Sequence, residues 1–382
     1  MTTPNLPLPQ SPMCQLQGRW YQRAAVCLRQ NAPQFQLPQP AHPVASDTQL
    51  WACLNTVPPH TETFNSVLRR AEPFFDEYAS IVGQFSFPAS QFASDIGQAN
   101  YTAWNAYVNG LTPPPTPQQL PALFHMWAIR NGAGAVAAKG VADLTVMAMC
   151  NAAKQALEPY QGSHPLPVDY MEGIDEVRQL LAYAPAAQID FDGSAPPPST
   201  PAWSRDSDDY LFGLWRGNDP RSRISQLFSR SNVTVQADFG AHLQWTSPAG
   251  AWYDSALLQN AYANTASPPW TEGGTPGWGD MFGPFGALRR AVANLTIVDA
   301  MHCVVECDAH FNWQDQLRIA FNVARGTWPF FQPAGAGVST TATFDSHGRL
   351  KLETHTQAGS PIVIAANVLD ISAFLGLGGQ SE

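Results

Sequence analysis

The sequence predicts a multidomain protein in which an N-terminal helical bundle is joined to a C-terminal α+β domain with an antiparallel sheet. Apolar residues recur at helical spacing between about residues 63 and 183, which is typical of packed helices. Residues 232–246 instead alternate strictly between apolar and polar side chains, which predicts a half-buried strand. The stretch between these regions, residues 192–209, is rich in proline, serine and aspartate, and so it predicts a linker.

These patterns divide the 382 residues into four parts. Residues 1–60 are rich in proline and glutamine and predict an extended surface arm, with a short helix near Trp20–Leu28. Residues 61–191 are the predicted helical domain, residues 192–209 the linker and residues 210–382 the α+β domain. A chain of this length is too long for one small core, which favours two domains.

Composition excludes some functions. The net charge is −10, and no run of basic residues occurs. Nucleic acid binding needs clustered lysine and arginine to neutralise phosphates, so we expect none. The first 20 residues lack the basic and apolar regions of a secretory signal. We therefore expect cytoplasmic synthesis, with release only by a route that needs no signal.

The predicted third helix, residues 122–157, contains the stretch GAGAVAAKGVA (132–142), in which almost every residue is small. Gly132, Gly134 and Gly140 each cost about 1 kcal/mol relative to alanine inside a helix. Close packing of this helix on a neighbour would compensate. The alternatives are a mobile helix that leaves the bundle to enter a membrane, or a loop formed by the glycines. The other helices of this domain are expected from about 63 to 82, 90 to 109 and 168 to 183.

The C-terminal domain carries further strand patterns. Residues 339–356 predict a hairpin that turns at DSHG, with Leu350 and Leu352 facing the core, and residues 361–369 predict a buried strand. We expect helices over residues 284–294 and from the capping residue Asn312 to Ala324.

Residues 295–310 also fit a strand, and the alternation separates their side chains into two faces. Cys303 and Cys307 fall on the apolar face and are expected to be core thiols. They are four residues apart, about 13 Å along a strand, which is too far for a disulfide or a shared metal ion.

The opposite face of this strand carries polar groups. His302, Glu306 and His310 project from it, and imidazole and carboxylate are ligands of zinc and iron. If the sheet is antiparallel, further polar residues line the same side: Asp238, His242, Glu353 and His355. The face is thus either a metal site or the ordinary wet side of a sheet.

Two glycine- and proline-rich stretches, residues 267–286 and 326–337, carry many aromatic side chains. Exposed rings on such loops would act as contact anchors for a partner; buried rings would cover the sheet. The candidate binding residues are Trp270, Trp278, Phe282, Phe285, Trp328, Phe330 and Phe331.

Two functional hypotheses follow. The first is a non-enzymatic soluble binding protein without a cofactor. Its partner is a neutral membrane, as for a membrane-active, toxin-like effector, or a glycan or a protein surface. The second is a metal-dependent enzyme that binds zinc or iron through His302, Glu306 and His310. The absence of catalytic motifs such as GxSxG or HExxH favours the first.

Overall fold

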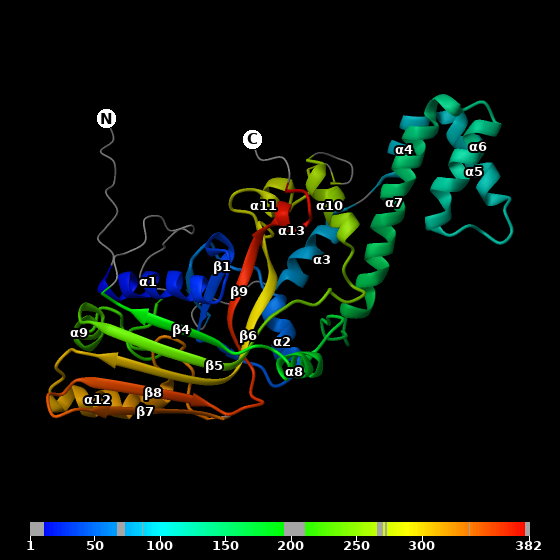
Figure 1. The fold of residues 1–382 in the computed structure, drawn as a ribbon. Helices are drawn as coiled ribbons and strands as arrows, with labels where there is room; N and C mark the ends of the chain where they lie inside the picture. Colours follow the sequence, from blue (N-terminus) through cyan, green and yellow to red (C-terminus); the bar gives the residue numbers. More distant parts are fainter. Residues whose placement is uncertain are drawn as a thin grey trace, which may run out of the picture. The chain divides into compact units, whose positions relative to one another are not determined.

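The computed structural model describes residues 11–66, 73–85, 87–194, 211–265, 270–271, 273–335 and 337–378. Over these residues the fold mixes helices with an open sheet (Figure 1). The helices are α1 (Pro12–Cys27), α2 (Asp47–Leu54), α3 (Phe74–Gln84), α4 (Ala89–Ile96), α5 (Gln98–Asn109), α6 (Leu120–Arg130), α7 (Ala137–Leu157), α8 (Ile174–Leu181), α9 (Arg223–Arg230), α10 (Ser255–Ala263), α11 (Trp278–Phe282), α12 (Trp313–Asn322) and α13 (Ile371–Phe374). The strands are β1 (Phe35–Gln39), β2 (His42–Pro43), β3 (Thr63–Asn65), β4 (Ala187–Asp192), β5 (Val233–Trp245), β6 (Arg290–Cys307), β7 (Val338–Phe344), β8 (Leu350–Thr356) and β9 (Ile362–Asp370).

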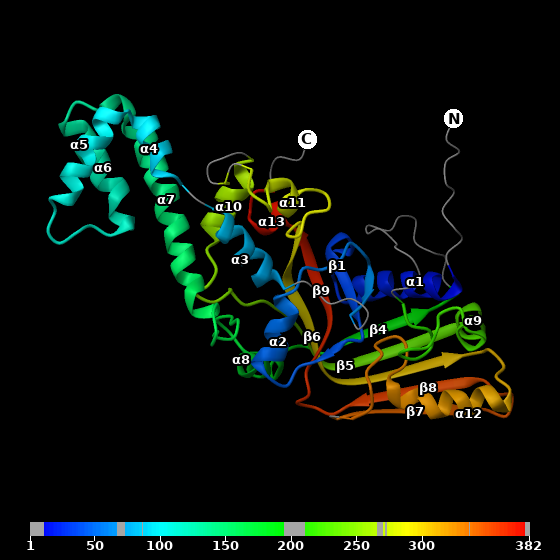
Figure 2. The same cartoon turned by 180° about the vertical axis from the view of Figure 1, so that it is seen from behind.

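The sheet is mixed. Its main order is β3-β1-β9-β6-β5-β4, and β8 pairs with β6 and carries β7 on its other side (Figure 2). β1 and β3 run parallel, whereas β4, β5, β6, β8 and β7 form an antiparallel series. The expected antiparallel sheet is therefore present, but a parallel pair from the N-terminal region extends it.

The predicted division into two successive domains is not confirmed. Residue contacts separate the chain into two compact units, each made of three stretches. Unit 1 comprises Met1–Glu72, Glu172–Pro248 and Val292–Leu369, and unit 2 comprises Pro73–Met171, Ala249–Ala291 and Asp370–Glu382. Of the predicted linker at 192–209, only residues 192–194 lie within the described residues.

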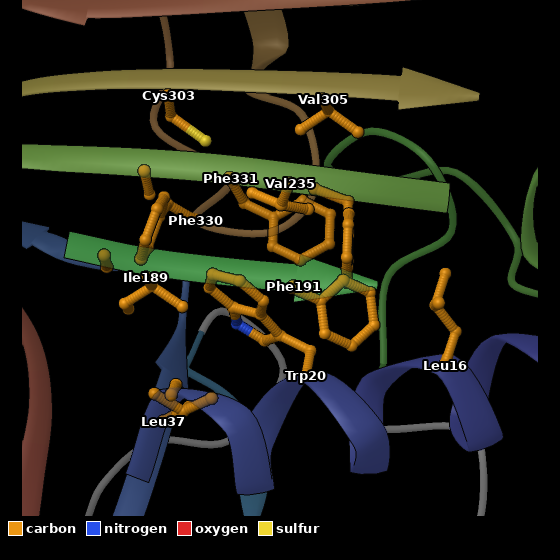
Figure 3. Close-up of a cluster of buried hydrophobic side chains, with 14 of the residues drawn as sticks. Leu16, Trp20, Leu37, Ile189, Phe191, Val235, Cys303, Val305, Phe330 and Phe331 are labelled. Carbon is orange, nitrogen blue, oxygen red and sulfur yellow. The ribbon is translucent and has the colours of Figure 1, made fainter. Parts of the chain in front are cut away.

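The N-terminal region is part of the core of unit 1 rather than an extended surface arm. Helix α1 buries Leu16, Trp20 and Ala24, which recur every four residues and so share one helix face. Trp20 makes edge-to-face contacts with Phe191 and Phe330, whose ring centroids lie 5.7 and 5.6 Å away (Figure 3). All five residues of β1 are buried as well. The short helix predicted near Trp20–Leu28 is present, but it begins eight residues earlier, at Pro12.

The strand predictions are the most accurate. β5 spans Val233–Trp245, β7 and β8 form the expected hairpin, and β9 matches the last predicted strand. Asn312 caps α12 by accepting a hydrogen bond from the backbone N–H of Asp315, as predicted. The helix expected over residues 284–294 is wrong, because residues from Arg290 onward belong to β6. Pro284 and Gly286, both frequent turn residues, precede β6, and turns form there instead of a helix.

The helix predictions for unit 2 need correction at their glycines. The helix expected over residues 90–109 is two helices, α4 and α5, separated by Gly97, whose φ is +83°. The long helix expected over residues 122–157 is also two, α6 and α7, separated by a turn at residues 131–133 and a short 3-10 helix at Gly134–Val136. Gly132 in that turn has a φ of +74°, which favours glycine.

Candidate functional site

The three residues predicted as metal ligands do not lie together. His302 and Glu306 are on the same face of β6. That strand ends at Cys307, so His310 lies outside it, and its Nδ1 contacts the backbone carbonyl of His347. Across the sheet, Glu306 is opposite Thr234 and Lys351. The structure therefore does not bring the predicted set together: His302 and Glu306 are four residues apart on one strand, about 13 Å, and His310 lies outside that strand.

A different set forms around His302. The antiparallel pairing of β6 with β8 places His355 directly opposite His302, and Glu353 is two residues along β8 on the same face. The Nε2 atoms of His302 and His355 lie 3.0 and 3.2 Å from the same oxygen of Glu353, Oε1. The two imidazole rings stack, with centroids 4.2 Å apart and planes 9° apart. We call His302, Glu353 and His355 the histidine–glutamate cluster.

The neighbours of Glu353 favour its charged carboxylate form. The hydrogen bond from His302 is the largest of the effects that hold the pKa of the Glu353 carboxyl below its usual value, and His355 and Lys351 act in the same direction. The Nζ atom of Lys351 lies 3.7 Å from the other carboxylate oxygen, Oε2. All three members of the cluster are half-buried or exposed, so water and solutes reach them.

The cluster belongs to the polar face of the antiparallel strands. A hollow of about 800 Å³ opens on the same face, between α1 and strands β4, β5 and β6. Arginine and carboxylate side chains both line it, together with Val304, which is two residues from His302 on β6. The lining charges are Arg19, Arg23, Asp190, Asp192 and Glu306.

The two cysteines of β6 are core residues, as predicted. Cys303 and Cys307 are 2% and 3% exposed, and burial raises the pKa of both thiols. Figure 3 shows Cys303 above the cluster of buried rings and aliphatic side chains on the inner face of the sheet. They take no part in the polar face.

Most of the predicted aromatic contact residues are buried. Trp270, Phe282, Trp328, Phe330 and Phe331 are each at most 7% exposed, so their rings fill the interior of their units instead of meeting a partner. Trp328 donates its indole N–H to the side-chain oxygen of Gln17. Trp278 is half-buried and donates to the backbone carbonyl of Tyr262. Only Phe285 of this set is fully accessible, at 94% exposed.

A row of exposed apolar side chains, two of them aromatic, lies on α12. Trp313, Leu317 and Phe321 are 67%, 57% and 83% exposed. They are spaced four residues apart, which aligns them as one ridge along the helix. The four-residue spacing of these side chains is visible in the sequence. The sequence does not show that the opposite side of α12, with Ile319 and Asn322, faces the core.

The glycine-rich region does not contain a membrane-spanning helix. Among the described residues, no helix combines the length and the apolar character that crossing a membrane requires. Lys139 of α7 pairs with Asp95 of α4 and with Asp143 at 3.2 and 2.9 Å, which ties α7 to its neighbour within unit 2. Gly140 packs closely against Phe124 of α6, as expected for a small-residue contact.

Searches of protein-family models, of curated proteins and of solved structures all find no match for this chain. Its function must therefore be inferred from its own residues.

Proposed function

We propose that the protein is a non-enzymatic binding protein that acts through protein–protein contact, and that a second copy of the chain docks on α12. The observation that carries the proposal is the exposed ridge of Trp313, Leu317 and Phe321. Large aromatic and aliphatic side chains on one helix face are the usual anchors of a helix that binds in a groove. The contact role expected of the aromatic loops is thus assigned to this helix.

The helix is held firmly in place, which suits a preformed docking surface. Asp315 on its inner side receives two hydrogen bonds from Nη1 of Arg223 on α9, at 2.7 and 2.6 Å. Ile319 is fully buried beneath the ridge. Because α12 is already ordered, little conformational entropy is lost when a partner binds.

A neighbouring strand supports a protein as the partner. α12 contacts β7, which pairs within the described sheet with β8 alone and so has one open edge (Figure 1). β7 has the sequence VSTTATF, without the charges, proline or bulge that usually protect such an edge. Open backbone groups can pair with a protein strand but find no partner in lipid hydrocarbon. We call the ridge and this edge the α12–β7 surface.

The ridge is also complementary to itself. Leu317 lies at its centre with one aromatic side chain four residues away on each side. Two copies of α12 related by a two-fold axis at Leu317 would place Trp313 of one copy against Phe321 of the other. Such self-complementarity is what a symmetric dimer requires. A flat bilayer instead favours a wide apolar face, and this ridge is one residue wide and bordered by Gln314 and Arg318.

Sedimentation velocity of the full chain tests the proposal. We expect a reversible dimer with a dissociation constant on the order of micromolar. Leu317→Asp should abolish it, because a carboxylate at the centre of the interface loses its water without gaining a partner. Leu180→Asp is the matched control, because Leu180 is a 40% exposed leucine on α8, and this variant should still dimerise.

Two results would overturn the proposal. One is a wild-type chain that stays monomeric at concentrations on the order of 100 micromolar, well above the expected dissociation constant. The other is equal loss of the dimer in Leu317→Asp and Leu180→Asp, which would place the interface elsewhere. Binding of the monomeric chain to neutral phosphatidylcholine vesicles, lost in Leu317→Asp, would replace the protein partner with a membrane.

A further inference from the structure

The donor atoms of the histidine–glutamate cluster lie close together on two paired strands. Two imidazole nitrogens converge on one carboxylate oxygen, and the three donor atoms lie within 4.8 Å of one another. They come from β6 and β8, whose pairing fixes His302 opposite His355. Side chains placed by two hydrogen-bonded strands are positioned more precisely than side chains on loops.

The spacing resembles that of donor atoms around a zinc ion. Zinc binds histidine nitrogen and glutamate oxygen at about 2.0–2.2 Å in a tetrahedral arrangement, so two donor atoms are about 3.3–3.6 Å apart. In this structure the two nitrogen–oxygen distances are 3.0 and 3.2 Å. To bind one ion, the donor atoms must move apart by a few tenths of an ångström, and the stacked rings, whose planes are 9° apart, must turn so that both Nε2 lone pairs point to the ion. All three side chains are at least 34% exposed, which leaves them room to turn.

We propose that His302, Glu353 and His355 form a binding site for a divalent transition-metal cation, with zinc as the fitting representative. This site is independent of the α12–β7 surface. Two imidazoles and one carboxylate leave at least one coordination position open for water or an external ligand. The proposal keeps the chemistry of the predicted polar face but changes two of its three ligands, from Glu306 and His310 to Glu353 and His355.

The surrounding charges suit a cation, with one exception. Asp238 on β5 is opposite His302 on the side away from β8, and the whole chain has a net charge of −10. The exception is Lys351, whose ammonium group lies 3.7 Å from Oε2 of Glu353. Lys351 is exposed and on a flexible stem, so it can turn away when a metal takes the carboxylate. Its removal should therefore strengthen metal binding.

Isothermal titration calorimetry of the full, metal-stripped chain with zinc chloride is the direct test. We expect one zinc ion per chain with a dissociation constant on the order of micromolar. His355→Ala and Glu353→Gln should each weaken binding at least about tenfold, because each removes one ligand of three. Lys351→Ala should strengthen it. Cobalt substitution gives a second readout, since the absorption spectrum reports the coordination geometry.

The control variants change Glu306 and His310, the two predicted ligands that lie outside the histidine–glutamate cluster. Glu306→Gln and His310→Ala leave the cluster intact and should bind zinc as the wild type does. Circular dichroism shows whether each variant is folded, and Glu353→Gln keeps the size and shape of the side chain. Absence of zinc binding up to about millimolar concentration, or equal binding by wild type, His355→Ala and Glu353→Gln, would overturn the proposal.

Discussion

Gly140 of α7 lies against the aromatic ring of Phe124 of α6. A Cβ atom added at Gly140 would be 2.1 Å from Cε1 of Phe124, well inside any permitted contact. We therefore predict that Gly140→Leu destabilises the protein by about 1–3 kcal/mol, because the ring or the helix must shift to make room. The free energy of unfolding in urea measures this directly.

Gly134 is the internal control for that prediction. It is exposed, and nothing lies within 4 Å of a Cβ atom built at this position. Gly134→Ala should leave the free energy of unfolding unchanged or raise it slightly, since alanine restricts the unfolded chain. If Gly134→Ala and Gly140→Leu cost the same, the small residues do not act through close packing against Phe124.

The N-terminal helix provides the second prediction. Trp20 is 1% exposed, and its ring packs against Phe191, Trp328 and Phe330. Trp20→Ala should cost about 3–5 kcal/mol, because it leaves a large cavity in the core of unit 1. Val26 lies on the same helix but is 67% exposed, so Val26→Ala should cost little. A small and equal effect of both changes would restore the surface arm that the composition suggested.

The sequence predicted the antiparallel strands better than anything else. Alternation in β5 and β6 reports burial on one face directly, so both the strands and the core position of Cys303 followed from it. The ends of the helices in unit 2 were harder to predict from the sequence. Gly97 and Gly132 have positive φ and end helices, while Gly140 sits inside one, and the three look alike in sequence.

The candidate sites could be predicted only in part, for a different physical reason. Which polar residues meet across a sheet depends on strand register, and strand pairing brings together His302 and His355, which are 53 positions apart in the chain. The prediction that His355 could share the polar face was correct, but nothing local favoured it over His310. Aromatic composition likewise does not reveal burial: Trp328 is core and Trp313 is surface.

The turn of the β7–β8 hairpin gives a prediction about pH. One carboxylate oxygen of Asp345 accepts hydrogen bonds from the backbone N–H groups of His347 and Arg349, both at 2.9 Å, and the other accepts from Nε of Arg349 at 2.6 Å. The backbone N–H of Arg349 contributes most to lowering the pKa of the Asp345 carboxyl from 3.8 to about 2.

A lowered pKa means that the folded state favours the charged carboxylate. Asp345 should therefore stabilise the protein fully above about pH 4, and this contribution should disappear as the pH falls through about 2. We predict that Asp345→Asn has a lower melting temperature than wild type at neutral pH, and that the difference shrinks over this acidic range. A difference that is constant between neutral pH and about pH 2 would contradict the assignment.

The self-association of α12 has a predictable salt dependence. Arg318 is exposed and adjacent to Leu317, so a two-fold axis at Leu317 brings the two copies of Arg318 near each other. Like charges repel, and salt screens this repulsion, with a Debye length of about 10 Å at 0.1 M and about 3 Å at 1 M. Sedimentation should therefore show tighter dimers at higher salt, and tighter dimers still in Arg318→Gln. Weakening by salt would point to an acidic partner surface in place of a second copy.

The ion pair beneath α12 supplies the last prediction. Asp315 has a side chain that is only 10% exposed, and Arg223 is its charged partner at 2.6 Å. Arg223→Ala would leave this carboxylate largely buried and unpaired, at a cost of about 1–3 kcal/mol in the free energy of unfolding. The cost should stay below that of a fully buried pair, because Arg223 itself is 61% exposed.

Arg178→Ala is the matched control, since the Arg178–Asp175 pair is exposed at 43% and 86% and should contribute at most about 1 kcal/mol. If Arg223→Ala costs no more than Arg178→Ala, the ion pair does not anchor α12. If it costs more, the variant should also weaken the dimer, because a loosened α12 no longer presents its ridge in one fixed orientation.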